Sequence, residues 1–140
     1  MIVTEEIIAE KFAEYNKMYF NYELPTPRFG LLKSYRTCGV FSCDKVIGKR
    51  HLKHQQIDIS VYYDWDEKDL RDIIVHEMIH YYLKYKHIDN EPGHNESFRS
   101  MAQEFNEKYG LNITEKIDTL SFKRAANAPK ISWFFAHYFG

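Results

Sequence analysis

Residues 66–87, DEKDLRDIIVHEMIHYYLKYKH, constrain the fold more than any other part of the sequence. They contain no proline and no glycine, and Asp64 or Asp66 is available as an N-cap, with acidic residues close behind. These signals predict one long helix. On that helix His76 and His80 are four residues apart, so their side chains lie on the same face. The opposite face is expected to carry the apolar bulk, from Ile74, Val75, Met78, Tyr82 and Tyr85.

The two histidines are suited to binding zinc, because at this spacing their ring nitrogens can be directed to one point. At about 100° per residue, Glu77 is turned away from His76 but lies only about 60° from His80. Its carboxylate therefore overlooks the same point without binding the metal, and can take a proton from water and pass it to a leaving amine. The pattern is the H-E-x-x-H of zinc proteases, although such residues also occur by chance as ordinary polar positions on a helix.

A catalytic zinc needs a third protein ligand that approaches from another direction and leaves one tetrahedral corner open. His94 meets this need best, because the DNEPG sequence before it predicts a turn that reverses the chain over the site. His87 is a poor candidate, since its backbone would lie about 10 Å beyond His80 along the same helix. Glu91 and Glu96 are the competing carboxylate ligands.

Two further helices are predicted on either side of this one. The first begins near Thr4, a plausible N-cap, and carries one apolar stripe formed by Ile8, Phe12, Tyr15 and Tyr19. The other follows the DNEPG turn and is expected to stop at Gly110, with one stripe formed by Phe98, Met101, Ala102, Phe105 and Tyr109.

Segments rich in β-branched and aromatic residues predict a small, mostly antiparallel sheet from residues 28–35, 36–43 and 55–63. Residues 111–122 and 130–139 are also expected to be strands. The fold class that follows is α+β, a compact zincin-like metalloprotease core with an N-terminal helix, the H-E-x-x-H helix and a third-ligand helix. No repeat or linker divides the chain, so we expect a single domain over residues 1–140.

Composition limits the partners of the protein. Hydrophobic residues make up 44% of the chain and the formal net charge is −1, which is typical of a folded protein with no global attraction to nucleic acid or anionic membrane. No apolar run is long enough to span a bilayer. With only two cysteines and no signal peptide pattern, we expect a cytoplasmic protein, with nucleoid or nuclear association as an alternative. We also expect a monomer. Weak DNA contact is expected through two groups of basic residues: Lys45, Lys49, Arg50 and Lys53, and Lys123, Arg124 and Lys130.

The basic residues around 45–54 have a simpler explanation, because lysines around a hairpin also keep an edge strand soluble. The C-terminal aromatic residues could stack on unpaired bases, but such residues also pack into protein cores. A second, structural zinc site of Cys38, Cys43, His51 and His54 is disfavoured, because the cysteines are an odd number of residues apart and face opposite sides of a regular strand. We expect one thiol to be buried and the other half-exposed.

Four segments together resemble the SprT-like zinc metalloproteases, the family that includes Spartan, a protease of DNA–protein crosslinks. They are FAEYNKMYFNYELP, VHEMIHYYL, PGHNESF and YGLNIT. The resemblance implies that His76, His80 and His94 bind one catalytic Zn²⁺, that Glu77 is the general base, and that Phe98 packs behind the third ligand. Relatives continue into a cysteine-containing zinc-binding subdomain, whereas this chain has no cysteine after Cys43, so we expect that subdomain to be lacking or truncated.

The hypothesis that follows is a zinc-dependent metallopeptidase that hydrolyses peptide bonds, with DNA-associated or DNA-crosslinked proteins as the substrates that the resemblance implies. An alternative is a metal-binding, nucleic-acid-associated or adaptor domain without proteolytic activity. A third is a zinc hydrolase that acts on something other than protein, because metal-assisted attack by water does not identify the acyl group.

Overall fold

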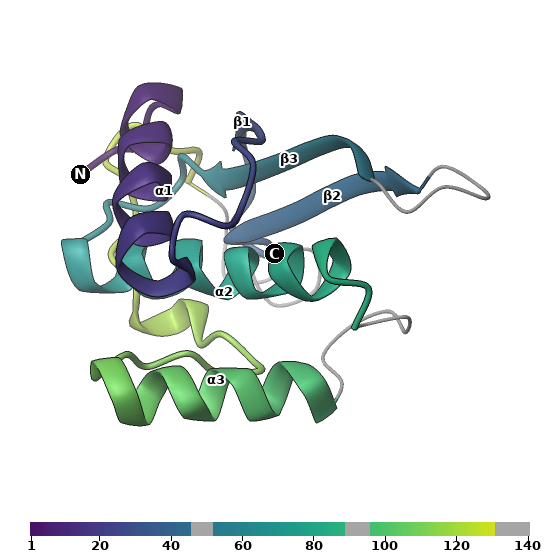
Figure 1. Ribbon diagram of the computed structural model, residues 1–140. Coiled ribbons are helices and arrows are strands. Elements are labelled where there is room, and N and C mark those ends of the chain that lie inside the picture. The colour runs from purple at the N-terminus through teal and green to yellow at the C-terminus, as the bar shows by residue number, and fades with distance from the viewer. Residues whose placement is uncertain (46–51, 89–95, 131–140) are drawn as a thin grey trace.

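The computed structural model describes residues 1–45, 52–88 and 96–130, without the side chain of Lys45. This described part of the chain is α+β, as predicted, with three α-helices and a small sheet (Figure 1). In chain order the elements are α1 (Glu5–Phe20), β1 (Arg28–Leu32), β2 (Gly39–Lys45), β3 (Leu52–Ser60), α2 (Glu67–Tyr85), α3 (Glu96–Tyr109) and the short 3-10 helix η1 (Thr119–Ser121). None of the described helices is long and apolar enough to cross a membrane.

The predicted first helix is confirmed. The Thr4 side chain caps α1 by accepting a hydrogen bond of 3.1 Å from the amide of Ile7, and acidic residues occupy the first turn. The apolar stripe is buried, and α1 packs against β1 and α2. The helix ends at Asn21, which adopts the left-handed conformation that commonly terminates helices.

The sheet is mixed, in the order β1-β3-β2. β2 and β3 are antiparallel, as expected of neighbours in sequence, but β1 and β3 are parallel. The short connection from β1 to β2 passes over the end of β3, so that β3 lies between the two strands. Two backbone hydrogen bonds hold the end of β3 there: the amide of Ser60 donates to the carbonyl of Cys38, and the amide of Val61 donates to the carbonyl of Leu32. β3 therefore inserts between the first two strands, and β2 is left at one edge.

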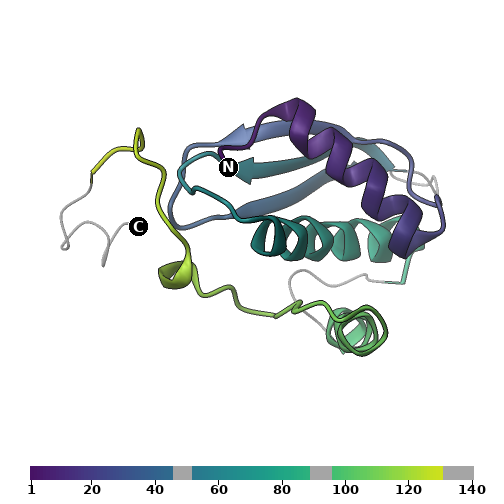
Figure 2. The ribbon, with the colours of Figure 1, turned by 90° about the vertical axis from the view of Figure 1, so that its left-hand side faces the viewer.

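The predicted long helix is confirmed as α2, with Asp66 as its N-cap and a hydrogen bond of 2.7 Å from the amide of Asp69 to the Asp66 carboxylate. It lies between the sheet and α3, so the molecule has three layers (Figures 1 and 2). The expectation that apolar side chains occupy the face opposite the histidines is too simple. Because α2 is covered on several sides, His76 and Glu77 are themselves buried, together with Ile73 and Ile79.

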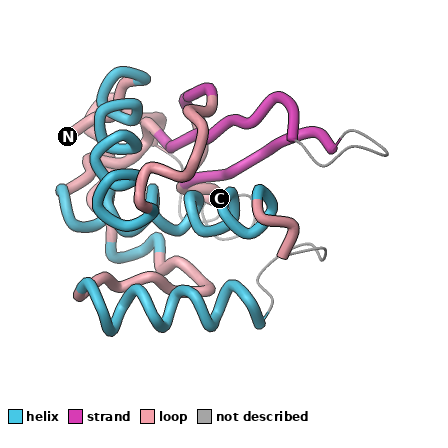
Figure 3. The backbone as a smooth tube through the Cα atoms, in the orientation of Figure 1, coloured by secondary structure: helices cyan, strands magenta, loops and turns pink. Residues whose placement is uncertain are grey.

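α3 ends at Gly110 as predicted, with a φ of 68° that favours glycine at that position. The strand predicted for 111–122 is wrong: this segment is a loop apart from η1 (Figure 3). The side chain of Asn106 donates to the carbonyl of Ile113 at 2.9 Å and accepts from its amide at 2.7 Å. The Asn106 side chain of α3 thus forms the two hydrogen bonds with the Ile113 backbone that a neighbouring strand would otherwise form. The strand predicted for 130–139 falls outside the described residues, except Lys130.

Candidate metal centre

α2 brings His76, Glu77 and His80 together. One ligand atom from each side chain lies within 4.8 Å of the others, and the imidazole centroids of the two histidines are 5.1 Å apart. His76 is 4% exposed and Glu77 is 5% exposed, while His80 is half-buried. Two imidazoles and a carboxylate so close together and so largely removed from water form a donor set that suits a divalent metal ion such as zinc. The chain therefore has a candidate metal-binding group where the sequence pattern predicts one.

The Glu77 carboxyl has an unusual electrostatic environment. Burial raises its pKa to about 8, because removing water disfavours the charged form, while a hydrogen bond from the backbone amide of Phe41 acts in the opposite direction. A dication held by the neighbouring histidines would also favour the carboxylate. The structure thus places beside the histidines a buried acid that is able to gain and lose a proton.

α3 contributes Phe98 to the same place. This ring is fully buried and stacks on the imidazole of His80, with centroids 4.5 Å apart and an interplanar angle of 22°. It also lies 4.8 Å from the ring of His76. Phe98 therefore packs directly against His76 and His80, whereas the position behind the third ligand that the resemblance implies stays a prediction. The stacked contact with His80 and the tilted contact with His76 restrict the orientation of both imidazoles.

Comparison with known proteins decides the family of this chain. The model of the SprT-like family matches residues 8–117, which run from the first turn of α1 into the loop beyond α3 and include the candidate metal group. The chain belongs to the SprT-like family. Membership suggests a zinc metallopeptidase-type domain, in agreement with the resemblance seen in the sequence. No curated protein gives a significant match to the chain.

The predicted third ligand of this SprT-like chain, His94, lies outside the described residues, as does Glu91. Its competitor Glu96 is exposed at the first position of α3. His87 follows α2 with a φ of 56° and does not belong to the metal-binding group. The role of His94 as the third ligand therefore stays a prediction.

Sequence reasoning missed two residues of β2. The backbone of Gly39 approaches Glu77 so closely that a Cβ atom there would lie 3.3 Å from a carboxylate oxygen of Glu77. Phe41 supplies the amide that donates to the same carboxylate. A glycine inside a strand pattern is a known signal of close backbone approach, but the sequence does not say what approaches.

The described residues contain no second metal-binding group. Cys38 is buried and Cys43 is half-buried, as expected. Burial raises the pKa of the Cys38 thiol to about 12. His54 Nδ1 lies 2.8 Å from a carboxylate oxygen of Asp44 on the neighbouring strand, and His51 is outside the described residues.

The described basic residues considered for DNA contact lie on two separate segments. On β3, Lys53 is exposed and pairs in register with Asp44, whereas Lys49 and Arg50 fall outside the described residues. Beyond η1, the guanidinium of the exposed Arg124 lies over the ring of Tyr35, 4.5 Å from its centroid. Lys123 and Lys130 are exposed on the same segment, with the Lys123 ammonium 3.4 Å from the Asp64 carboxylate.

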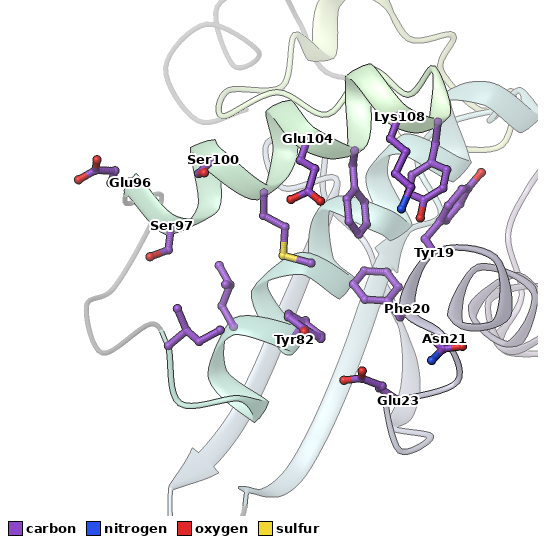
Figure 4. A pocket seen from close by; sticks show the side chains of 15 residues that line it. Tyr19, Phe20, Asn21, Glu23, Tyr82, Glu96, Ser97, Ser100, Glu104 and Lys108 are labelled. Atoms are coloured by element: carbon purple, nitrogen blue, oxygen red, sulfur yellow. The ribbon is translucent and has the colours of Figure 1, made fainter.

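Two cavities lie along α2. The larger, of about 710 Å³, lies between α3 and the C-terminal parts of α1 and α2, and none of the three grouped residues lines it. Aromatic rings such as Phe20 and Tyr82 form its base, and Glu104 and Lys108 of α3 form its upper side (Figure 4).

The smaller cavity, of about 170 Å³, is lined by His76 together with Asp72, Asn112 and Phe122. It lies between α2 and the loop that follows α3. Open space therefore reaches the candidate metal group from the side of this loop.

Proposed function

We propose that this SprT-like chain is a zinc-dependent metallopeptidase, in which His76, His80 and His94 bind one catalytic Zn²⁺ and Glu77 is the general base. The observation that carries the proposal is the buried group of His76, Glu77 and His80, which lies under Phe98 and within the family match. Zinc bound there supplies a Lewis acid that polarises the scissile carbonyl and increases the acidity of water.

The residues of the chain have distinct tasks in this proposal. The imidazoles of His76 and His80 are oriented by their shared helix and by the Phe98 ring. The Glu77 carboxylate takes a proton from the attacking water, and the resulting carboxyl delivers it to the nitrogen of the leaving amine. Burial of Glu77 supports this role, because a pKa near 8 in the metal-free chain means that the group binds a proton readily.

Substrates in this proposal are proteins or peptides. Proteins associated with or crosslinked to DNA are the class that the family resemblance implies, and the exposed Lys53, Lys123, Arg124 and Lys130 support at most weak DNA contact. We further propose that the chain acts as a single domain and a monomer in the cytoplasm.

The test is Glu77→Gln, measured by cleavage of labelled casein with zinc content determined on the same sample. We expect zinc to stay bound and cleavage to fall by at least about 100-fold, because the amide cannot accept the water proton. Glu10→Gln on the exposed side of α1 is the matched control and should retain full activity. Unchanged cleavage by Glu77→Gln would refute the mechanism. Zinc binding without any cleavage by the wild-type protein would favour a binding or adaptor domain.

Dependence on DNA is tested separately, with a DNA-bound basic protein as substrate. The wild-type chain is incubated with it in the presence and absence of single-stranded DNA. Stimulation by DNA would support action on DNA-associated proteins, and equal rates would indicate general proteolysis.

A further inference from the structure

The outer edge of β2 faces away from the rest of the sheet. In an antiparallel pair, opposite residues alternate between pairs that exchange backbone hydrogen bonds and pairs that do not. The amide of Ser60 donates to the carbonyl of Cys38 at 2.8 Å, so this pair and the Val40–Asp58 pair are the bonded ones. The backbone groups of Gly39 and Phe41 therefore point away from β3, and among the described strands β2 has no neighbour on that side.

The outward-pointing amide of Phe41 has a specific acceptor, the carboxylate of Glu77 on α2. The ring of Phe41 stacks almost parallel on Tyr81, with centroids 4.9 Å apart and an interplanar angle of 15°. Tyr81 lies one helical turn after Glu77 and is anchored by a hydrogen bond of 2.8 Å from its hydroxyl to the carbonyl of Pro25. One residue of β2 thus contacts α2 twice, through its ring at Tyr81 and through its amide at Glu77.

Gly39 leaves space for this contact. A Cβ atom on Gly39 would lie 3.0 Å from Ile73 Cγ2, 3.1 Å from Ile59 Cδ1 and 3.3 Å from Glu77 Oε2. Both isoleucines are buried in the core and have little room to move. A methyl group at position 39 would therefore push β2 or the Glu77 carboxylate away from its present position.

We propose that Gly39 and the backbone amide of Phe41 form a positioning site for the Glu77 carboxylate, which fixes the direction in which Glu77 faces the metal-binding histidines. Both are positioning residues, because they act through Glu77. The assignment of Glu77 as the general base rests on the proposed function, whereas the contact itself does not.

The first experiment is Gly39→Ala, assayed with labelled casein in the zinc-loaded full-length chain. We expect kcat to fall by roughly 10- to 100-fold, the cost of displacing a reacting group by about 1 Å. KM and zinc content should stay close to wild type. Val40→Ala is the matched control, because Val40 is the next residue of the same strand and is exposed on the other face.

A mutant cycle separates positioning from general damage to the fold. If Gly39 acts through Glu77, adding Gly39→Ala to Glu77→Gln should cause little further loss of the residual activity. An equal loss in both backgrounds, or a normal kcat in a folded Gly39→Ala variant, would overturn the proposal. If Glu77→Gln is fully active, the proposed function fails instead, and the contact must be judged by the second experiment.

The second experiment needs no activity and no substitution at Gly39. Hydrogen exchange of the Phe41 amide is followed by NMR in the wild-type chain, in Glu77→Gln and in Glu77→Ala. Although this amide points away from β3, we expect protection in the wild type and in Glu77→Gln, which keeps an acceptor oxygen. In Glu77→Ala exchange should be at least about 10-fold faster, while the Val40 amide, bonded to β3, changes little. Rapid exchange of the Phe41 amide in the wild type would overturn the proposal.

Discussion

Substitution of Phe98 should weaken zinc binding, and the loss of affinity should be larger than the accompanying loss of folding stability can explain. The ring is fully buried and contacts both histidines of the candidate metal group, at 4.5 Å and 4.8 Å between centroids. Removing it entirely, as in Phe98→Ala, would cost about 3–5 kcal/mol of folding free energy. Phe98→Leu keeps most of the apolar volume and should cost only about 1.5 kcal/mol, yet it removes the flat surface that holds the imidazole of His80.

Loss of a group that orients metal ligands typically weakens metal affinity by about 10- to 100-fold, equivalent to about 1.4–2.8 kcal/mol. The measurement is competition for zinc between a chromophoric chelator and the folded protein, with stability obtained from urea unfolding of the metal-free chain. Phe105→Leu is the matched control, because Phe105 is also buried on α3 but packs on Phe20 and Tyr109. It should lose similar stability and keep wild-type zinc affinity. Equal zinc affinities for both variants would refute the reasoning.

Two more predictions concern the whole chain. Zinc should raise the free energy of unfolding by about 2.7 kcal/mol when its free concentration is a hundred times the Kd. A chelator should therefore lower the melting temperature by several degrees. An unchanged melting temperature would contradict a metal site. Stability should also fall as pH rises from about 9 to about 12, because the Cys38 thiol stays protonated in the folded chain while the same thiol ionises near pH 9 when unfolded. In urea titrations across this range Cys38→Ala should show a shallower decline, by at most about 1.4 kcal/mol per pH unit, and identical slopes would contradict burial of the thiol.

Local signals account for the parts of the fold that could be predicted. The N-caps Thr4 and Asp66 and the stop at Gly110 depend on neighbours within one turn of helix, and all three are found where expected. The order and direction of the strands depend instead on which distant segments meet. Nothing near β1 in the sequence indicates that β3 would insert beside it in parallel.

The error at 111–122 has the same origin. The segment has the composition of a strand, but strand formation requires a partner with unpaired backbone groups. Asn106 supplies a side-chain amide that bonds both the amide and the carbonyl of Ile113, so the chain stays in a loop. Whether the Ile113 backbone bonds to the Asn106 side chain or to a neighbouring strand depends on tertiary packing, which the composition of the segment does not indicate.

For the candidate site, the sequence by itself determined the grouping of His76, Glu77 and His80, because they lie within five residues of one helix, where the 3.6-residue period fixes their relative directions. Only the tertiary structure decided the surroundings of these three side chains. It buried Glu77 under Gly39, directed the Phe41 amide to its carboxylate, and stacked Phe98 on the histidine pair. The physical reason is that a helix specifies angles between its own side chains, whereas burial and hydrogen bonds from other segments arise only when β2 and α3 pack against it.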